Sequence, residues 1–336
     1  MKNTKKLIIV GTLPSSLINF RGELLKEFVS KGFNVIALAS GANFEEITEI
    51  ESLGVKYIDT PVKNTSINPL IDIKTIKFYK SIFKKEKPDY VLSYSIKPII
   101  WSGVALRSYP TIQFTALITG LGYVFSGSGF IRNILRWLVS ILYKISLKRA
   151  NNVIFQNWDN LDRFVKLGLV LQSKTHRISG SGVNIKNYNF TKLPKTKINF
   201  LCIARLLGEK GLREYAAAAK IVKNKFPSVI FQLVGPSNYS RDAISLDEIH
   251  GWSNYLTYNN ATKDVRPFIK KCHVFVLPSY HEGIPRSTLE AMSMGRPVIT
   301  TNAVGCKDTV VEKRNGFKVP IKSAQAIAKK MFWFIE

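Results

Sequence analysis

Short runs of apolar and β-branched residues alternate with longer helical patterns along the whole chain, and this alternation restricts the fold more than any other feature. In the first half we predict strands at residues 6–11, 34–40, 55–61, 89–95, 111–117 and 152–157, and in the second half at 198–205, 229–235, 255–258, 274–279 and 297–301. Helices are predicted between them, at residues 21–31, 43–53, 70–85, 131–149, 160–167, 212–225, 242–252, 265–271, 286–294 and 323–334. Strands separated by helices form parallel sheets with right-handed crossovers. The sequence therefore predicts two doubly wound α/β domains.

The chain is long enough for two such domains, because it has 336 residues and a domain usually takes about 100–200. A polar stretch rich in Gly and Asn separates the two series of strands. We predict an N-terminal domain at 1–180, a linker at 181–197 and a C-terminal domain at 198–336. The three cysteines are isolated in sequence, which favours a reducing compartment over a disulfide scaffold or a zinc site.

The chain is strongly basic, with a net charge of +26. A uniform excess of basic residues is consistent with binding to an anionic membrane, to nucleic acid or to phosphorylated ligands. It is equally consistent with a genome-wide bias of composition toward Lys. One stretch is not uniform: from Tyr90 to Trp158 there is no Asp or Glu. The basic residues of this stretch are Lys97, Arg107, Arg132, Arg136, Lys144, Lys148 and Arg149.

Within that stretch, residues 130–150 form a predicted helix with basic side chains repeating every four residues and an otherwise apolar surface. The uncharged run from Trp137 to Tyr143 is far shorter than the roughly 18 residues of a membrane span. The helix can lie in a membrane interface with its cations on lipid phosphates. It can equally be a core helix whose cations reach solvent. The residues alone leave both interpretations open.

Two carboxylates follow the predicted strand at 274–279. Gly283 and Pro285 shape a tight loop that carries Glu282, and the helix that starts there carries Glu290. The free N–H groups at this helix start can bind hydroxyl or anionic oxygen, and carboxylates accept hydrogen bonds from vicinal sugar hydroxyls. The alternatives are a solvent-exposed acid for Glu282 and an i,i+4 ion pair with Arg286 for Glu290.

A second group follows the first strand of the C-terminal domain. Arg205 stands at the strand end and Lys210 precedes Gly211 and the next helix, so both cations can converge on a diphosphate. The alternative is a pair of loop cations neutralised by Glu209 or water. Ligands of parallel sheets bind beyond the carboxyl ends of the strands, which favours the first interpretation.

These two groups resemble the retaining nucleotide-sugar glycosyltransferases of family four, which have the GT-B fold of two facing Rossmann-like domains. The resemblance implies that Arg205 and Lys210 bind the donor diphosphate, that Glu282 holds the sugar and that Glu290 binds the ribose. It assigns the remaining donor-binding positions to Gly283, Ile284, Pro285 and Arg286. Catalysis would rest on Arg205, Lys210 and Glu282.

Phe20-Arg21 and the interdomain segment Gly180–Asn184, with Asn where Asp is usual, also resemble family four. In the first half, Ser95–Pro98 and Thr119–Phe125 resemble a bacterial subgroup that extends undecaprenyl-diphosphate-linked sugars. Many relatives carry an active-site His in the first domain, whereas this chain has no His before residue 176. Ser15, Ser16 and Lys97 are the acceptor-side candidates.

The resemblance implies transfer of a hexose or N-acetylhexosamine from a UDP-sugar, with retention, to a polyprenyl-diphosphate-linked saccharide. It implies a cytoplasmic enzyme, peripheral on the inner face of the membrane, with no nucleic acid partner and no cofactor beyond the donor. The sequence has no Asp-x-Asp, no zinc spacing and no Gly-x-Gly-x-x-Gly after the first strand, so we expect no metal and no nicotinamide.

Two alternatives remain, a nucleotide-sugar epimerase of related fold and a non-catalytic membrane-associated remnant. Relatives usually continue beyond the position that matches Glu336, with a helix that crosses back to the first domain. We therefore expect a truncated crossover helix, an incomplete C-terminal domain and exposed side chains at Met331, Phe332, Trp333 and Phe334.

Overall fold

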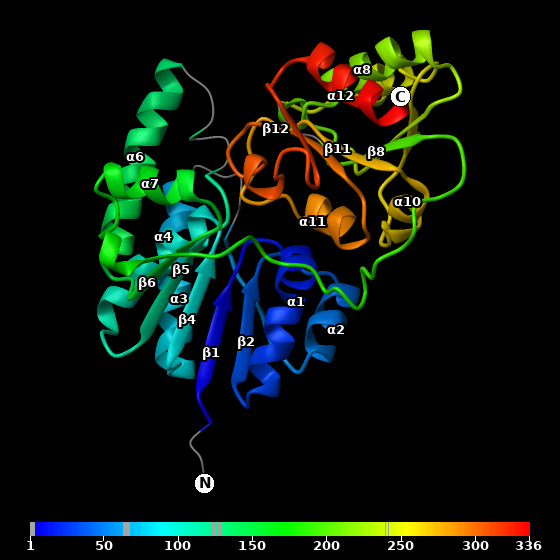
Figure 1. Ribbon diagram of the computed structural model, residues 1–336. Coiled ribbons are helices and arrows are strands. Elements are labelled where there is room, and N and C mark those ends of the chain that lie inside the picture. Colours follow the sequence, from blue (N-terminus) through cyan, green and yellow to red (C-terminus); the bar gives the residue numbers. More distant parts are fainter. Residues whose placement is uncertain (1–3, 63–67, 122–124, 126–128, 239, 241) are drawn as a thin grey trace. The chain divides into compact units, whose positions relative to one another are not determined.

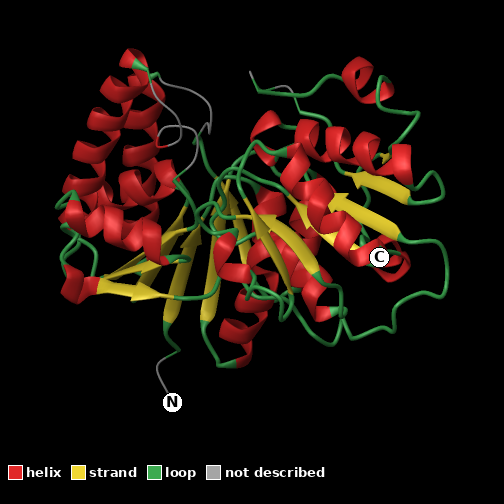
Figure 2. Ribbon diagram, turned by 45° about the horizontal axis from the view of Figure 1, so that its top comes forward, coloured by secondary structure: helices red, strands yellow, loops and turns green. Residues whose placement is uncertain are grey.

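The computed structural model describes residues 4–62, 68–121, 125, 129–238, 240 and 242–336. The chain divides into two compact units, Met1–Ser181 and Gly182–Glu336. Each unit contains one parallel sheet with helices on its faces (Figure 1; Figure 2).

The sheet of the first unit has the strand order β3-β2-β1-β4-β5-β6-β7, and all its neighbours pair in parallel. Its strands are β1 (Lys6–Val10), β2 (Asn34–Ala39), β3 (Lys56–Asp59), β4 (Tyr90–Tyr94), β5 (Gln113–Ile118), β6 (Asn152–Phe155) and β7 (Thr175–Arg177). Its helices are α1 (Pro14–Ser30), α2 (Phe44–Ser52), α3 (Pro69–Glu86), α4 (Ile96–Ala105), α6 (Phe130–Leu147) and α7 (Trp158–Lys166).

Alternate residues of β1 point to opposite faces of the sheet and belong to the two cores of this unit. Leu7 and Ile9 pack with residues of α1 and α2, whereas Ile8 and Val10 pack with residues of α3, α4, α6 and α7. This is the two-residue period of a strand buried on both faces, and it explains the continuous apolar run that starts the chain's first strand.

The sheet of the second unit has the order β10-β9-β8-β11-β12-β13, again all parallel. Its strands are β8 (Asn199–Ile203), β9 (Ile230–Val234), β10 (Thr257–Asn259), β11 (Val274–Leu277), β12 (Val298–Thr301) and β13 (Gly316–Val319). Its helices are α8 (Leu212–Lys225), α9 (Leu246–His250), α10 (Arg266–Lys271), α11 (Arg286–Ser293) and α12 (Ala324–Ile335).

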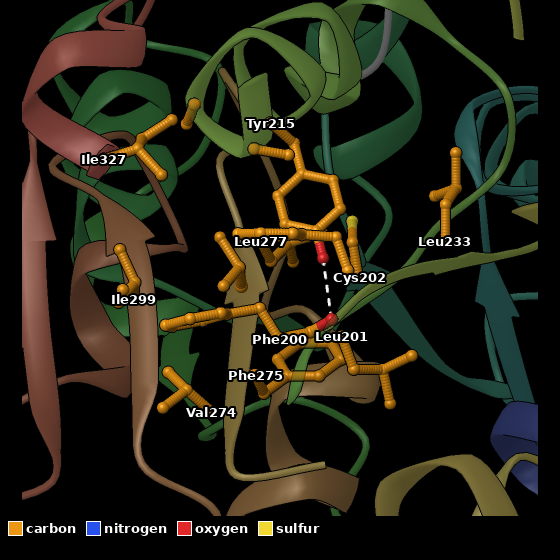
Figure 3. Packing of buried hydrophobic residues seen from close by; sticks show 14 of the residues in the cluster. Phe200, Leu201, Cys202, Tyr215, Leu233, Val274, Phe275, Leu277, Ile299 and Ile327 are labelled. Carbon is orange, nitrogen blue, oxygen red and sulfur yellow. Dashed lines mark hydrogen bonds between the residues drawn. The ribbon is translucent and has the colours of Figure 1, made fainter. Parts of the chain in front are cut away.

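The core of the second unit lies between α8, α12 and the central strands. Phe200, Phe231 and Phe275 are fully buried there, together with Tyr215 of α8. The Tyr215 hydroxyl donates to the Phe200 carbonyl at 2.9 Å, so this polar atom stays paired inside an apolar cluster (Figure 3).

The predicted linker packs onto the second unit rather than running free. The guanidinium of Arg296 is almost fully buried and donates to the carbonyls of Ile269, Met294 and Lys270 and to the Thr191 hydroxyl. The Ser293 hydroxyl donates to the Tyr188 carbonyl at 2.6 Å. These bonds tie residues 188–191 to the end of α11.

Several expected elements differ from those observed. Helix α1 begins at Pro14, seven residues before the predicted start, because Pro suits the first helical turn. Ser15 and Ser16 are therefore helical rather than in a loop. Helix α4 occupies the segment that starts at Ile96, which was expected to be a loop, so Lys97 also lies on a helix. Strands β7 and β13 were not predicted.

The expectation of an uncovered apolar end is largely wrong. Met331 is fully buried, and Phe332 and Phe334 pack against the core of the second unit. Trp333 alone among the four is largely exposed, and its ring contacts that of Phe317. Helix α12 thus finds its partners in α8 and β13.

Candidate active site

The loops after β8 and β11 meet at one edge of the second sheet. These strands are neighbours and run in parallel, so their carboxyl ends lie side by side. Gly211, between the first loop and α8, has a φ of 70°. A Cβ atom there would lie 2.1 Å from the carbonyl oxygen of Pro278. Glycine is therefore required for both the turn and the close approach of the two loops.

Lys210 and Glu282 form a short ion pair at this edge, with 2.6 Å between Nζ and Oε1. The two residues are 72 positions apart in sequence. Lys210 is 8% exposed, and the Glu209 carboxylate lies farther away, at 3.9 Å. The Lys210 ammonium is therefore largely buried, and Glu282 is the closer of its two acidic neighbours. The structure brings these two predicted residues together.

Backbone and side-chain bonds fix the loop that carries Glu282. The Tyr280 N–H donates to the Glu209 carbonyl at 2.9 Å, and the Tyr280 hydroxyl donates to Glu214 at 2.6 Å. The Glu282 N–H donates to the Val304 carbonyl at 3.0 Å. The loop is therefore attached both to the β8 side and to the segment after β12, so the Glu282 carboxylate has little freedom to move.

Glu290 lies on α11, 8% exposed, with Arg286 Nε donating to its Oε1 at 2.8 Å. Burial raises the pKa of Glu290, while Arg286 and a hydrogen bond from Tyr188 oppose that rise. The i,i+4 pair expected as the alternative is present, but it is buried rather than solvated. Tyr188 was not identified from sequence, because its contact depends on how residues 188–191 fold back onto the helix.

The remaining donor-side candidates lie around the start of α11. Pro285 is buried and precedes the helix, and no described side chain caps the first turn. Gly283 and Ile284 are half-buried in the loop. Arg205 is exposed at the end of β8.

A polar network lies at the carboxyl edge of the first sheet. Ser16 shares a hydrogen bond of 2.8 Å with the hydroxyl of Tyr94, and the Arg21 guanidinium lies over the Tyr94 ring. Arg21 is almost fully buried and donates to the Ser181 hydroxyl at 2.8 Å. A Cβ atom on Gly11 would lie 2.3 Å from the Tyr94 hydroxyl, which explains the glycine after β1. Ser16 was an acceptor-side candidate from the sequence, whereas Tyr94 was not.

Lys97 is held by α3. Its Nζ lies 2.8 Å from Asp72 Oδ1, and the Trp101 indole donates to the same oxygen at 3.1 Å. The acid-free stretch therefore receives a carboxylate from another helix. Ser15 is exposed on the first turn of α1. Gly122, Tyr123 and Val124 of the Thr119–Phe125 motif lie outside the described residues.

Neither a metal-binding cluster nor a membrane-spanning helix occurs in the described part of the chain. No three His, Cys, Asp or Glu side chains there are grouped closely enough to hold a metal ion. No helix there is both long and apolar enough to cross a bilayer.

Comparisons with known families match both units. Residues 197–336 match the family model of the group 1 glycosyl transferases, and residues 17–157 match that of the glycosyl transferase 4-like proteins. Two solved structures share the fold. A sucrose-phosphate synthase from Thermosynechococcus elongatus has a TM-score of 0.79 at 19% identity, covering 98% of this chain and 90% of its own. A HepE protein from Anabaena, in complex with UDP-glucose, has a TM-score of 0.73 at 17% identity, covering 98% and 90%. The predicted GT-B fold is confirmed.

Curated relatives carry more specific names. The chain is 27% identical to an N,N'-diacetylbacillosaminyl-diphospho-undecaprenol alpha-1,3-N-acetylgalactosaminyltransferase of Campylobacter jejuni, covering 96% of this chain and 87% of that protein. It is 24% identical to a UDP-Gal:alpha-D-GlcNAc-diphosphoundecaprenol alpha-1,3-galactosyltransferase of Escherichia coli, covering 86% and 76%. The epimerase and remnant alternatives are not favoured by these relatives.

Proposed function

Because the chain belongs to the group 1, family-four-like glycosyltransferases of GT-B fold, we propose that it moves a hexose or N-acetylhexosamine from a UDP-sugar to a lipid-linked saccharide, with retention. The names of the Campylobacter jejuni and Escherichia coli relatives support this class of acceptor. The observation that carries the proposal is the part-buried Lys210–Glu282 pair at the carboxyl edge of the second sheet.

Lys210 has the position and charge to stabilise the departing diphosphate. The bond between the anomeric carbon and the diphosphate oxygen breaks while an acceptor hydroxyl bonds to that carbon and gives up its proton to the departing UDP. Negative charge grows on the diphosphate as its bond to the sugar breaks. A fixed cation near that oxygen lowers the barrier most when it is already desolvated and oriented. Lys210 meets both conditions, because it is largely buried and held in place. Arg205 is exposed and can turn towards the bound diphosphate, where its planar guanidinium can donate to two oxygens at once.

Glu282 and Glu290 then have separate roles. When the donor binds, hydroxyls of the transferred sugar donate hydrogen bonds to the Glu282 carboxylate and replace part of its ion pair with Lys210. The N–H groups at the start of α11 donate to other oxygens of the same sugar. Glu290, oriented by Arg286 and Tyr188, accepts hydrogen bonds from the ribose. With fixed cations on the diphosphate, the proposed reaction needs no metal and no cofactor beyond the donor.

Helix α6 supports a peripheral location on an anionic membrane, at the inner face of the cytoplasmic membrane. Ser146 of α6 fits against Gly103 of α4, and its hydroxyl donates to the Ile99 carbonyl at 2.7 Å. The other side of the helix is apolar and exposed, through Phe130, Ile134, Trp137, Leu138, Ile141 and Ile145. These positions follow the helical period, so they form one continuous stripe. A stripe of this kind beside basic residues is typical of an interfacial helix.

The test is product formation on a synthetic polyprenyl-diphosphate saccharide with a panel of UDP-sugars. We expect one donor to give acceptor-dependent UDP release and an α-linked product from an α-linked donor. Release of UDP without an acceptor product, or interconversion of the free donor, would contradict the proposal.

A further inference from the structure

Residues 187–192 of the linker, termed the strap, lie against the end of α11, the helix that carries Glu290. Two residues of this helix hold Tyr188 at both of its ends. The Ser293 hydroxyl donates to the Tyr188 carbonyl at 2.6 Å, and the Tyr188 hydroxyl donates to the Glu290 carboxylate. Ser293 follows Glu290 by three residues, so both side chains lie on one face of α11. Tyr188 is therefore fixed by its backbone and by its side chain from the same helix face.

Arg296, in the turn after α11, holds the other end of the strap. Its guanidinium is 2% exposed and donates to the Thr191 hydroxyl at 2.8 Å and to the Lys192 carbonyl at 3.4 Å. The same guanidinium donates to the carbonyls of Ile269 and Lys270 at the end of α10. One buried cation therefore joins the strap to α10 and to the turn after α11.

Two further contacts order the strap along its length. Gly295 has a φ of 84°, and a Cβ atom there would lie 2.6 Å from the Phe190 ring. Glycine therefore ends the helix in the left-handed conformation and also lets the strap approach it closely. Arg266 of α10 donates to the Asn187 carbonyl at 3.4 Å. The strap is thus an ordered part of the second unit from its first residue to its last.

We propose that the strap is part of the donor site, and that Ser293 and Arg296 are positioning residues that act through it to hold Tyr188 against Glu290. The inference rests on the proposed role of Glu290 at the ribose of the donor. It adds a coupling between donor binding and the docking of the linker. A ligand that binds more tightly when the strap is docked must itself favour docking, because such coupling is reciprocal. UDP and the contacts of the strap should therefore stabilise each other.

The first measurement is UDP affinity of the full chain, by calorimetric titration at neutral pH. Ser293→Ala removes the hydrogen bond to the Tyr188 carbonyl, so we expect UDP binding to weaken roughly threefold to tenfold. The KM for the donor should rise by a similar factor while kcat is retained. In a Tyr188→Phe background the same substitution should have little effect, because the strap then presents no hydroxyl to Glu290.

A second variant and a control accompany Ser293→Ala. Thr191→Val removes the hydroxyl that Arg296 binds but nearly keeps the shape of the side chain, and it should also weaken UDP binding. It avoids replacing the buried Arg296, whose loss can prevent folding. Ser52→Ala is the matched control, because Ser52 also ends a helix but donates to the Glu49 carbonyl of that same helix. Its UDP affinity should equal that of the unmodified chain.

Amide hydrogen exchange separates positioning from a loss of stability. The Thr191 N–H donates to the Met294 carbonyl at 3.3 Å, so its exchange rate reports whether the strap is docked. UDP should slow this exchange in the unmodified chain and in Ser52→Ala, and much less in Tyr188→Phe. A lower melting temperature alone would not make the effect of UDP depend on the Tyr188 hydroxyl.

The outcomes distinguish the two proposals. Unchanged UDP affinity in Ser293→Ala, an equal effect of that substitution with and without the Tyr188 hydroxyl, or exchange at Thr191 that does not respond to bound UDP would each overturn the positioning role and leave the proposed function standing. Absence of UDP binding by the unmodified chain would contradict both. If UDP binds and the strap responds but no sugar reaches any acceptor, the proposed reaction fails and the positioning role stands.

Discussion

Gly211 allows the loop that carries Lys210 to approach the loop that follows β11 and carries Glu282. Its φ of 70° and the 2.1 Å separation between an added Cβ and the Pro278 carbonyl leave no room for a side chain. We expect Gly211→Ala to cost about 2–3 kcal/mol in the free energy of unfolding, and to lower turnover because Lys210 moves with the loop. Gly22→Ala is the control: its Cβ would meet nothing nearer than 4.0 Å, so it should be neutral or stabilising. Urea titrations of both variants measure this, and equal midpoints would contradict the steric argument.

Glu290 predicts a pH dependence of donor binding. Burial raises its pKa, so the carboxylate is protonated before an ordinary glutamate, whose pKa is about 4.3, as the pH falls. A protonated carboxyl loses acceptor capacity for ribose hydroxyls, so UDP affinity should fall as the pH is lowered from neutral. The free energy of unfolding should change in the opposite direction to UDP affinity. Because the pKa of Glu290 is raised in the folded state, ionised Glu290 disfavours folding, and this penalty is relieved as the pH falls and the carboxyl is protonated.

Calorimetric titration with UDP checks this dependence across pH. Glu290→Gln should bind UDP weakly and with little change over the same range. Tyr188→Phe removes a hydrogen bond that favours the carboxylate, so it should shift the loss of UDP affinity to higher pH while retaining binding at neutral pH. A pH profile of Tyr188→Phe identical to that of the unmodified chain would show that Tyr188 does not position Glu290.

At the scale of elements, helix α6 carries a prediction about membrane binding. Trp137, Leu138 and Ile141 are exposed, so replacing all three with Ser should leave the melting temperature nearly unchanged. Burying such side chains in lipid is worth about 1.5–3 kcal/mol each, so the triple variant should lose more than tenfold in affinity for anionic vesicles. Trp333→Ser is the matched control, since Trp333 is a similarly exposed indole on α12. Vesicle sedimentation of the triple variant at the level of the control would remove α6 as the membrane anchor.

Elements with a strong hydrophobic period could be predicted from the sequence. Elements whose structure depends on packing against other elements could not. Helix α8 has the predicted bounds of 212–225, because its buried positions recur at helical spacing. Helix α4 was missed, because its apolar residues form an almost continuous run that is packed on both sides, by α3 and α6. Lys210 and Glu282 could be assigned to one edge from parallel topology alone. The pairing of Lys97 with Asp72 and of Tyr188 with Glu290 depends on tertiary packing that no local pattern encodes.

At the scale of the whole molecule, the chain combines a net charge of +26 with a candidate diphosphate site built on protein cations. The large positive charge favours encounter with anionic donors and membranes, and this long-range effect weakens with salt. The chemistry itself should not weaken in the same way, because Lys210 is largely shielded from solvent. We therefore expect added salt to raise the apparent KM for the donor more than it lowers kcat, in steady-state assays at constant acceptor concentration. A fall in kcat with no change in KM would contradict the prediction that salt acts mainly on the encounter with the donor.

We propose that a fixed lysine, rather than a metal, stabilises the departing diphosphate. The most direct measurement is acceptor-dependent UDP release in the presence of EDTA, compared between the unmodified chain, Lys210→Ala and Arg205→Lys. We predict full activity of the unmodified chain with EDTA, a loss of about 10²–10³ in kcat for Lys210→Ala, and a smaller loss for Arg205→Lys, whose ammonium cannot bind two oxygens at once. Activity that EDTA abolishes and Mg²⁺ or Mn²⁺ restores, or near-normal turnover of Lys210→Ala, would contradict the account.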